Sequence, residues 1–363
     1  MNTERQEALA AHLRGWIPLE SKEKNPTYVR LIEAVLNTPQ LFALAASVPE
    51  PQLPANVLFA SVHFLLLQGV GHPLALHYPT VRLRHGLTAT ATSSLEEDFI
   101  DFTKTHQAEL SQLLATGITQ TNEVARSAIL ASVLCDLRSA GHEKVALLDA
   151  GCSAGLNLFV DRYRIEHSPT FRTGPTQSAV TLSPRHDGRM PAGEMANIVA
   201  RVGLDQQPLD PSSERDATWL EACLWPDDPS RFSRLQAALS IASNERHSLH
   251  LHAGDLVSDL RTVAATIPSD VPLVIFSSWA AAYLRPGEHE LLTRAMDDVG
   301  SRRTVFWLSC EHPSIAASLQ LVPTGYRTTW PGASLLTLRT CGEDATTVVV
   351  GESHPHAEWI NLA

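Results

Sequence analysis

The pattern of residues 145–163 places the strongest constraint on the fold. A short apolar run at 145–148 leads into the glycine-rich segment 149–155, and an amphipathic stretch follows at 156–163. This order predicts a buried strand, a tight turn and a helix. Further apolar strand candidates alternate with helical segments and lie at 179–182, 198–204, 249–252, 273–276, 304–308, 335–338 and 346–350. The alternation predicts an α/β fold, a Rossmann-like, mostly parallel sheet with helices on both faces.

The residues before this segment show helical periodicity and almost no strand alternation. Apolar positions recur at helical spacing around 31–36 and 57–66, and prolines and glycines separate the helical segments. A chain of 363 residues is long enough for about two domains. We therefore expect an all-helical N-terminal region over residues 1–140 and the sheet domain over residues 141–363.

The charge balance argues against nucleic acid as a partner. Asp and Glu number 39 and Lys and Arg 28, which gives a formal net charge of −11, whereas nucleic-acid binding needs a basic surface. No apolar run reaches the roughly 18 residues of a membrane span, and the N-terminus lacks the pattern of a secretory signal. Five scattered cysteines form no C-x-x-C pair. These features predict a cytoplasmic protein that does not bind membranes.

The glycine-rich turn is the main candidate for cofactor binding. Small residues let a ligand approach the backbone closely, and N–H groups at the start of the following helix can face polar ligand atoms. The spacing Gly151-x-Ser153-x-Gly155 differs from the dinucleotide fingerprint G-x-G-x-x-G. With the strand-end acid Asp149 before it and Asn157 after it, the turn matches the pattern by which methyltransferase-type Rossmann domains bind S-adenosylmethionine. A turn needed only for packing is the alternative.

Two more acids follow predicted strands. Asp255 comes just after the strand at 249–252, at the edge of the sheet where ligands bind, and would suit an adenine amino group. A helix cap is an equally good interpretation of Asp255. No acid directly follows the strand candidate at 179–182, so Asp205, at the end of 198–204, is the candidate for binding a ribose.

The segment 120–126 concentrates polar side chains ahead of an apolar helix. Asn122, Glu123 and Arg126 can reach over a neighbouring cleft, and the last two lie three residues apart on one helical face. From spacing alone, a capped helix with an ordinary surface ion pair is the better interpretation.

Aromatic residues mark two other candidate binding segments. Trp219 and Trp225, with Asp and Arg nearby, can form a stacking wall, although large aromatics more often belong to a core. Ser278, Trp279 and Tyr283 follow the strand at 273–276, where methyltransferase-like sheets place the reacting methyl group.

The sixteen histidines raise the question of a metal site. His250 and His252 share one face of a predicted strand, and the pairs at 311–312 and 354–356 add further candidate ligands. Neither an H-E-x-x-H motif nor a three-ligand spacing occurs. We expect no metal site.

Several motifs in one order resemble the bacterial family known as domain of unknown function 2332. The matching stretches are 54–67, 71–74, 120–126, 151–163, 201–210, 219–227, 278–279 and 283–284. The resemblance implies a class I S-adenosylmethionine-dependent methyltransferase fold behind a helical N-terminal region. It also strengthens 120–126 and 201–210 as elements of a site.

The leading hypothesis is an enzyme that transfers a methyl group from S-adenosylmethionine to a small molecule. The substrate would lie between the sheet domain and a helical lid, held by Asn122, Arg126, Trp225 and Trp279, while Ser278 joins the cofactor-binding residues. If the acceptor must lose a proton, the candidate bases are Glu123, His63 and Tyr283, in that order. The alternatives are a regulatory protein that binds a nucleoside or S-adenosylmethionine, and a metal-dependent enzyme that uses the histidine-rich strand faces.

Overall fold

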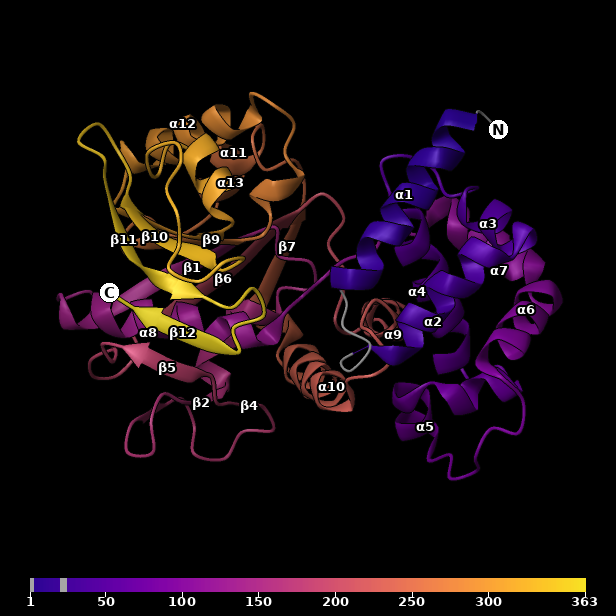
Figure 1. Cartoon of the computed structure of the whole chain (residues 1–363). Coiled ribbons are helices and arrows are strands. Elements are labelled where there is room, and N and C mark those ends of the chain that lie inside the picture. The colour runs from indigo at the N-terminus through magenta and orange to yellow at the C-terminus, as the bar shows by residue number, and fades with distance from the viewer. Residues whose placement is uncertain (1–2, 20–24) are drawn as a thin grey trace. The chain divides into compact units, whose positions relative to one another are not determined.

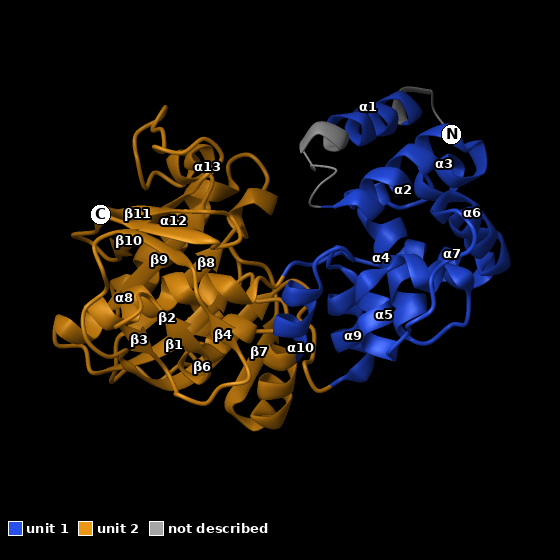
Figure 2. Ribbon diagram, turned by 60° about the horizontal axis from the view of Figure 1, so that its bottom comes forward, with its two compact units in different colours: residues 1–121, 213–236 blue, residues 122–212, 237–363 orange. Residues whose placement is uncertain are grey.

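Two compact units make up the chain (Figure 2). The computed structural model describes residues 3–19 and 25–363. Unit 1 contains Met1–Thr121 and Ser213–Gln236, and unit 2 contains Asn122–Ser212 and Ala237–Ala363. The sequence predicts a single boundary at residue 140. The structure has three, after Thr121, Ser212 and Gln236, because a later segment returns to the helical unit.

Unit 1 is helical throughout its described residues. Proline occupies the first turn of α2, α3, α4, η1 and α5, where its missing N–H costs nothing. The helices are α1 (Thr3–Leu19), α2 (Pro26–Asn37), α3 (Pro39–Ala45), α4 (Pro54–Leu67), η1 (Pro73–His77), α5 (Pro79–His85), α6 (Leu95–Thr105), α7 (Gln107–Thr116) and α9 (Glu214–Ala222). Helix α4 is buried along most of its length and forms the centre of this unit.

Polar contacts explain why the segment 213–236 belongs to unit 1. The carboxylate of Asp227 accepts bonds from the backbone N–H and the hydroxyl of Thr27, at 3.0 and 2.6 Å. Arg84 forms an ion pair with Glu221, which is buried. The helix that follows, α10 (Pro229–Asn244), begins in unit 1 and ends in unit 2.

The sheet of unit 2 has nine strands and is mostly parallel, as the sequence predicts (Figure 1). The strand order is β5-β12-β11-β10-β9-β8-β1-β6-β7. Strands β9, β8, β1, β6 and β7 run parallel to one another. Strands β10, β11 and β12 continue from β9 as an antiparallel meander. The strands are β1 (Lys144–Ala150), β5 (Arg185–Gly188), β6 (Asn197–Asp205), β7 (Leu249–Ala253), β8 (Leu273–Ser278), β9 (Val305–Glu311), β10 (Ser334–Thr340), β11 (Thr346–Ser353) and β12 (Trp359–Leu362).

Helices cover both faces of this sheet. Figure 1 shows α11 (Leu260–Ala264), α12 (Glu288–Gly300) and α13 (Pro313–Ser318) on one side and α8 (Ser127–Ser139) on the other. Leucine, isoleucine and alanine side chains of the strands pack against the first three helices, and this core includes Trp307, a large and fully buried side chain. Helix α8 is buried along most of its length, which places it in unit 2 although it lies before residue 140.

Two local predictions differ from the structure. The strand expected at 179–182 is reduced to β4 (Thr181–Leu182), which joins β2 (Arg164–Glu166) and β3 (Arg172–Thr173) in a separate three-stranded sheet. The helix expected after the glycine-rich turn is a short 3-10 helix, η3 (Leu156–Arg162), with non-helical dihedrals at Phe159. Shorter 3-10 segments are η2 (Val124–Arg126), η4 (Arg246–Ser248) and η5 (Ala281–Tyr283).

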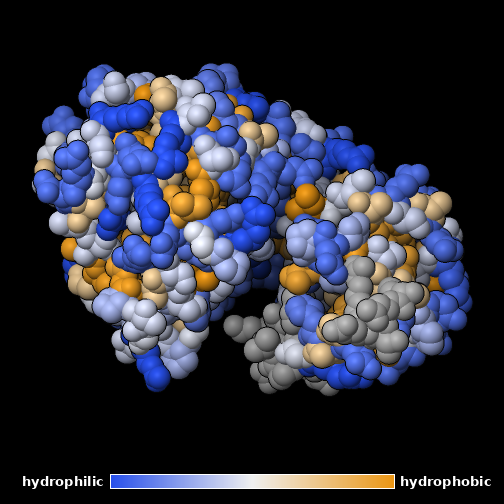
Figure 3. Space-filling view, turned by 90° about the horizontal axis from the view of Figure 1, so that it is seen from above, coloured by the Kyte–Doolittle hydropathy of each residue, from blue (hydrophilic) through white to orange (hydrophobic). Residues whose placement is uncertain are grey.

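The surface is mainly polar. In Figure 3, hydrophilic residues cover most of the visible face and hydrophobic residues appear in separate groups. Within the described ranges, the helices are too short or too polar to cross a membrane.

Gly203 on β6 allows the glycine-rich turn to lie against the sheet, and its replacement tests this packing. A Cβ atom at this position would lie 2.5 Å from Cys152 Sγ and 2.8 Å from Leu251 Cδ2. We expect Gly203→Ala to lower the free energy of unfolding by about 1–3 kcal/mol, the usual cost of overpacking. Urea denaturation measures the change, and Gly71→Ala is the control because no atom lies within 4 Å of its Cβ position. Equal stability of the two variants would contradict this account.

Candidate functional site

The carboxyl ends of the parallel strands form the candidate site. From β1 the chain continues to β6 on one side, whereas β8 lies on the other side of β1, so the strand order reverses between β1 and β8. Open α/β sheets bind ligands at the carboxyl edge next to such a reversal. The edge here is built from the segments that follow β1, β6, β8, β9 and β11.

The N–H groups of the glycine-rich turn bond within the protein. Those of Gly151 and Cys152 donate to Leu204 O, and that of Ser153 donates to Asp205 Oδ2 at 2.8 Å. Gly151, Ser153 and Gly155 have positive φ, which bends the turn sharply. The segment that follows is a 3-10 helix, and the N–H of its first residue, Leu156, donates to Asn122 Oδ1 at 3.2 Å.

Asn122 holds the two ends of this turn together. Its Nδ2 donates to Cys152 O at 3.1 Å, and its Oδ1 accepts from the N–H of Leu156 at 3.2 Å. The side chain is buried and both ends of its amide are engaged. In this structure Asn122 positions the turn, and the substrate contact that the sequence predicts for it stays a prediction.

The same turn has the G-x-S-x-G spacing of a nucleophile elbow. Ser153 has a φ of 52°, as a strained elbow serine would. An elbow, however, exposes its serine and leads into an α-helix. Ser153 is only 4% exposed and a 3-10 helix follows, so the conformation serves the packing of the turn.

Asp149, at the end of β1, is a buried acid with an unsatisfied oxygen. It is 3% exposed, and within the described part of the chain its Oδ2 has no hydrogen-bond partner. Burial, together with the nearby charge of Asp205, raises the pKa of Asp149 to about 7, while Arg126 acts in the opposite direction. A buried acceptor of this kind is costly unless a ligand supplies a donor.

Arg126 is the cation of the site. Its guanidinium donates to Pro355 O at 2.8 Å and to Ser278 O at 3.3 Å, so it bridges the segments that follow β11 and β8. The side chain is buried, and its positive charge partly offsets the rise in pKa that burial causes at Asp149 and Glu311. Both of these hydrogen bonds are to backbone carbonyl groups, and the place of Arg126 in a binding site stays a prediction.

Glu311, at the end of β9, was not among the predicted site residues. It is fully buried, and its Oε1 accepts from the N–H groups of Ala280 and Ala281 at 3.0 and 3.1 Å. Its Oε2 has no partner among the described residues, and burial raises its pKa to about 7. The sequence does carry a signal for Glu311, since it is an acid at the end of an apolar strand, as Asp149 is. Sequence reasoning considers Glu311 only as a possible metal ligand beside His312.

The segment after β8 has an unusual backbone. Trp279 has a φ of 57°, and its indole Nε1 donates to Ser334 Oγ at 2.9 Å. A Cβ atom at Gly151 would overlap the methyl group of Ala280, so the segments after β1 and β8 are in direct contact. Ser278 lies at the end of β8, as predicted, and Tyr283 is 85% exposed on η5.

The two other strand-end acids differ in their surroundings. Asp205 is half-buried, and its two oxygens accept from the N–H groups of Ser153 and Gln207. Asp255 accepts from the N–H groups of Val257 and Ser258, which lowers its pKa. These bonds close a turn over residues 256–259, and the N-cap of α11 is Asp259, so Asp255 caps a turn and not the helix expected there.

Glu123 lies at the same edge and contacts a histidine. Its Oε1 accepts from the N–H of Ala125 at 3.1 Å, and its Oε2 is 3.4 Å from His356 Nδ1. The imidazole is 44% exposed while the carboxylate is buried. A buried carboxylate and a partly exposed imidazole are therefore in contact at this edge.

Four other predicted residues have structural roles. His63 is fully buried in unit 1, its ring nitrogens bond to Ala222 O and Thr80 Oγ1, and burial lowers its pKa to about 4. These contacts argue against His63 as a base. Trp225 packs on Tyr28, also in unit 1, and Asn157 is buried and accepts a bond from Ser127. Gly155, at the start of η3, packs against leucines of β7.

Acids predominate among the ionisable side chains described at the carboxyl edge. Glu123, Asp149, Asp205 and Glu311 supply four carboxyl groups around one guanidinium, that of Arg126. No group of three or more metal-ligating residues occurs in the described ranges. The edge therefore suits an organic cation with hydrogen-bond donors better than a phosphate.

The raised pKa of Asp149 makes stability depend on pH. Its value of about 7 exceeds the ordinary 3.8, so the folded chain holds this proton more tightly than the unfolded chain does. The contribution of this proton to the free energy of unfolding is complete below the ordinary pKa of 3.8, and it is lost as the pH rises through the folded-state pKa of about 7. From about pH 5 to about pH 8, the free energy of unfolding should therefore fall more steeply in the wild type than in Asp149→Asn. Denaturant titrations measure both slopes; Asp298→Asn, at an exposed position, should keep the wild-type slope, and an equally steep slope in Asp149→Asn would refute the prediction.

The chain shows a weak likeness to a solved structure described as "DhpI-SAM-HEP complex". The two are 12% identical, and the match covers 70% of this chain and 81% of that chain. The TM-score is 0.21, which is too low to carry an argument. Among curated proteins there is no match.

A family model agrees with the resemblance seen in the sequence motifs. The family is described as "Uncharacterized protein conserved in bacteria (DUF2332)", and its model matches residues 18–361. The match spans parts of both units and every residue of the carboxyl edge described above. The chain therefore belongs to this bacterial family.

Proposed function

We propose that the carboxyl edge of unit 2 binds S-adenosylmethionine and that the protein transfers its methyl group to a small molecule. The observation that carries the proposal is the unpartnered Oδ2 of Asp149, buried at the end of β1 beside the turn. The excess of carboxyl groups at this edge supports a cationic ligand. The net charge of −11 favours a small acceptor over a nucleic acid.

The residues present fit the functional groups of this cofactor. Its ammonium would donate to Asp149 Oδ2, which satisfies the buried acceptor and favours the ionised carboxylate. Asp205, at the end of the neighbouring strand β6, bonds two backbone N–H groups, and each carboxylate oxygen can accept a second bond, here from a ribose hydroxyl.

S-adenosylmethionine supplies a methyl group activated by its sulfonium. Transfer of this group needs alignment of the two reactants more than acid–base chemistry. The contribution of the chain is to position the reactants and keep water away. Asn122 and Asp205 fix the turn on one side, and Glu311 fixes the segment after β8 on the other. The edge is therefore organised before a ligand arrives.

His356 is the group best placed to accept a proton from an acceptor that must lose one. Its ring is 44% exposed, and the buried carboxylate of Glu123, 3.4 Å away, can orient it. Glu123, first among the predicted bases, then acts through His356. Tyr283 has an exposed ring at the same edge, but among the described residues no carboxylate pairs with its hydroxyl.

Isothermal titration with S-adenosylmethionine tests the binding step. We expect Asp149→Asn to weaken binding about 10- to 100-fold, the loss that follows from removing a hydrogen bond to a charged group. Asp298→Asn, which neutralises an exposed acid of α12 in the same unit, should bind like the wild type. Absence of binding to the wild type, or equal binding by Asp149→Asn, would overturn the proposal.

Incubation with methyl-labelled cofactor and a metabolite extract then tests the transfer. Label in a small molecule, lost in Asp149→Asn, supports an enzyme. Binding without any transfer would instead favour the regulatory alternative, in which the bound nucleoside acts as a signal.

A further inference from the structure

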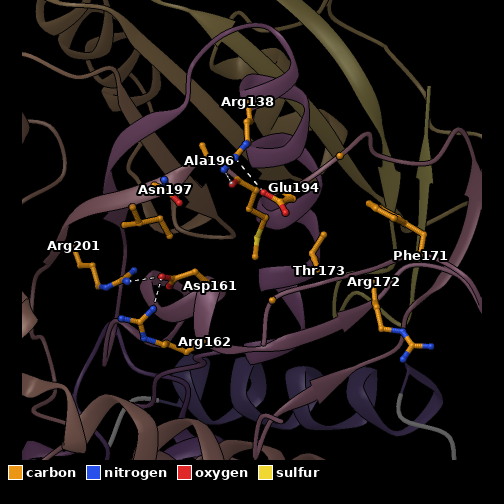
Figure 4. Close-up of a pocket in the computed structure, with 14 residues that line it drawn as sticks. Arg138, Asp161, Arg162, Phe171, Arg172, Thr173, Glu194, Ala196, Asn197 and Arg201 are labelled. Atoms are coloured by element: carbon orange, nitrogen blue, oxygen red, sulfur yellow. Dashed lines mark hydrogen bonds and ion pairs between the residues drawn. The ribbon is translucent and has the colours of Figure 1, made fainter. Parts of the chain in front are cut away.

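A second site candidate lies on the opposite side of unit 2 from the carboxyl edge. A pocket of about 760 Å³ opens at the beginning of β6, next to the end of α8, η3 and β3 (Figure 4). Its volume is within the range of about 300–1,000 Å³ typical of small-molecule sites. Asn197 and Ile198, the first residues of β6, line it, so the pocket is at the amino edge of the sheet.

The polar lining of this pocket is predominantly positive. Four arginines contribute to it, and two acids accompany them, although the whole chain is strongly acidic. The arginines are Arg138, Arg162, Arg172 and Arg201, and the acids are Asp161 and Glu194. Figure 4 shows them on different walls: Arg138 with Glu194, Arg162 and Arg201 around Asp161, and Arg172 apart from both groups.

One wall of the pocket is rigid. Arg201 is buried, donates to Leu158 O at 2.6 Å and to Asp161 Oδ2 at 2.7 Å, and lies over the ring of Phe159. Arg162 donates to the same oxygen of Asp161 at 2.7 Å. Arg162 also pairs with Glu245 through two bonds, at 2.6 and 2.9 Å. The two guanidinium groups of this wall are therefore held in place by two carboxylates, and the wall serves as a fixed boundary of the pocket.

The other two arginines are available to a ligand. Arg138 pairs with Glu194 at 3.1 Å, but Glu194 is 83% exposed, and an ion pair in such a position contributes little. Arg172 forms no ion pair with any described residue, and its guanidinium makes a long hydrogen bond, 3.5 Å, to Pro169 O. A ligand anion can therefore displace Glu194 from Arg138 and meet Arg172 at little cost.

We propose that this pocket binds a small organic anion through a carboxylate or phosphate group. The planar guanidinium groups match the oxygens of both. The ligand is organic rather than a bare ion because the pocket far exceeds the size of an oxyanion and Phe171 and Met195 give it apolar surface. The site requires neither the methyl donor nor any residue of the carboxyl edge.

Calorimetric titration with phenyl phosphate and with benzoate tests the proposal and separates the two anion types. Benzyl alcohol is the neutral control, and inorganic phosphate reports the contribution of the oxyanion alone. We expect at least one organic anion to bind, more tightly than its controls and less tightly as salt is added. Arg138→Gln and Arg172→Gln should each raise its dissociation constant about tenfold or more.

A change of opposite sign makes the test specific. Glu194→Gln removes the carboxylate that competes for Arg138, so it should lower the dissociation constant about two- to fivefold. Arg185→Gln, an exposed arginine of β5 outside the pocket, should change nothing. Thermal unfolding confirms that each variant is folded; Arg172 and Glu194 are exposed, so their variants should fold normally. No heat with either anion at millimolar concentration, or equal affinity in wild type, Arg172→Gln and Glu194→Gln, would overturn the proposal.

Discussion

The attachment of the glycine-rich turn to its neighbours is the interaction on which the rest of unit 2 depends. Asp205 holds the N–H of Ser153, Leu204 O accepts from two more amides, and Asn122 spans the turn from Cys152 to Leu156. These bonds allow β1 to end in a tight turn without a long helix behind it. They also leave Asp149 directly beneath the turn, buried and incompletely bonded.

Buried carboxyl groups give this edge its chemical character. Asp149 and Glu311 end two strands of the same sheet, each keeps one oxygen without a partner, and burial raises the pKa of both to about 7. Arg126 opposes this rise at both acids. A buried acid with an unsatisfied oxygen lowers the stability of the fold, and a ligand that donates a hydrogen bond to it would restore that stability. Apolar side chains in the same positions would pack without this cost, so the acids are not explained by stability alone.

The sequence was sufficient to predict the elements whose signal is local. Apolar runs located β1 and β6 to β11 to within a few residues, and helical periodicity identified the all-helical character of the described N-terminal residues. Asp149 and Asp205 could be found because each ends such a run. The return of 213–236 to unit 1 could not, because it depends on contacts such as that of Asp227 with Thr27, 200 residues away. The 3-10 form of η3 likewise depends on side chains that periodicity does not report.

The same reasoning explains why Arg126 and Glu123 were only partly understood from their spacing. Three residues apart, they suggested an ion pair with each other on one helical face. In the structure they contact the segment after β11 instead: Arg126 donates to Pro355 O, and Glu123 contacts His356. These partners are more than 200 residues away, so no local pattern could name them. A segment near the end of the chain thus completes the edge that begins at β1, and the site is a product of the sheet order rather than of any single motif.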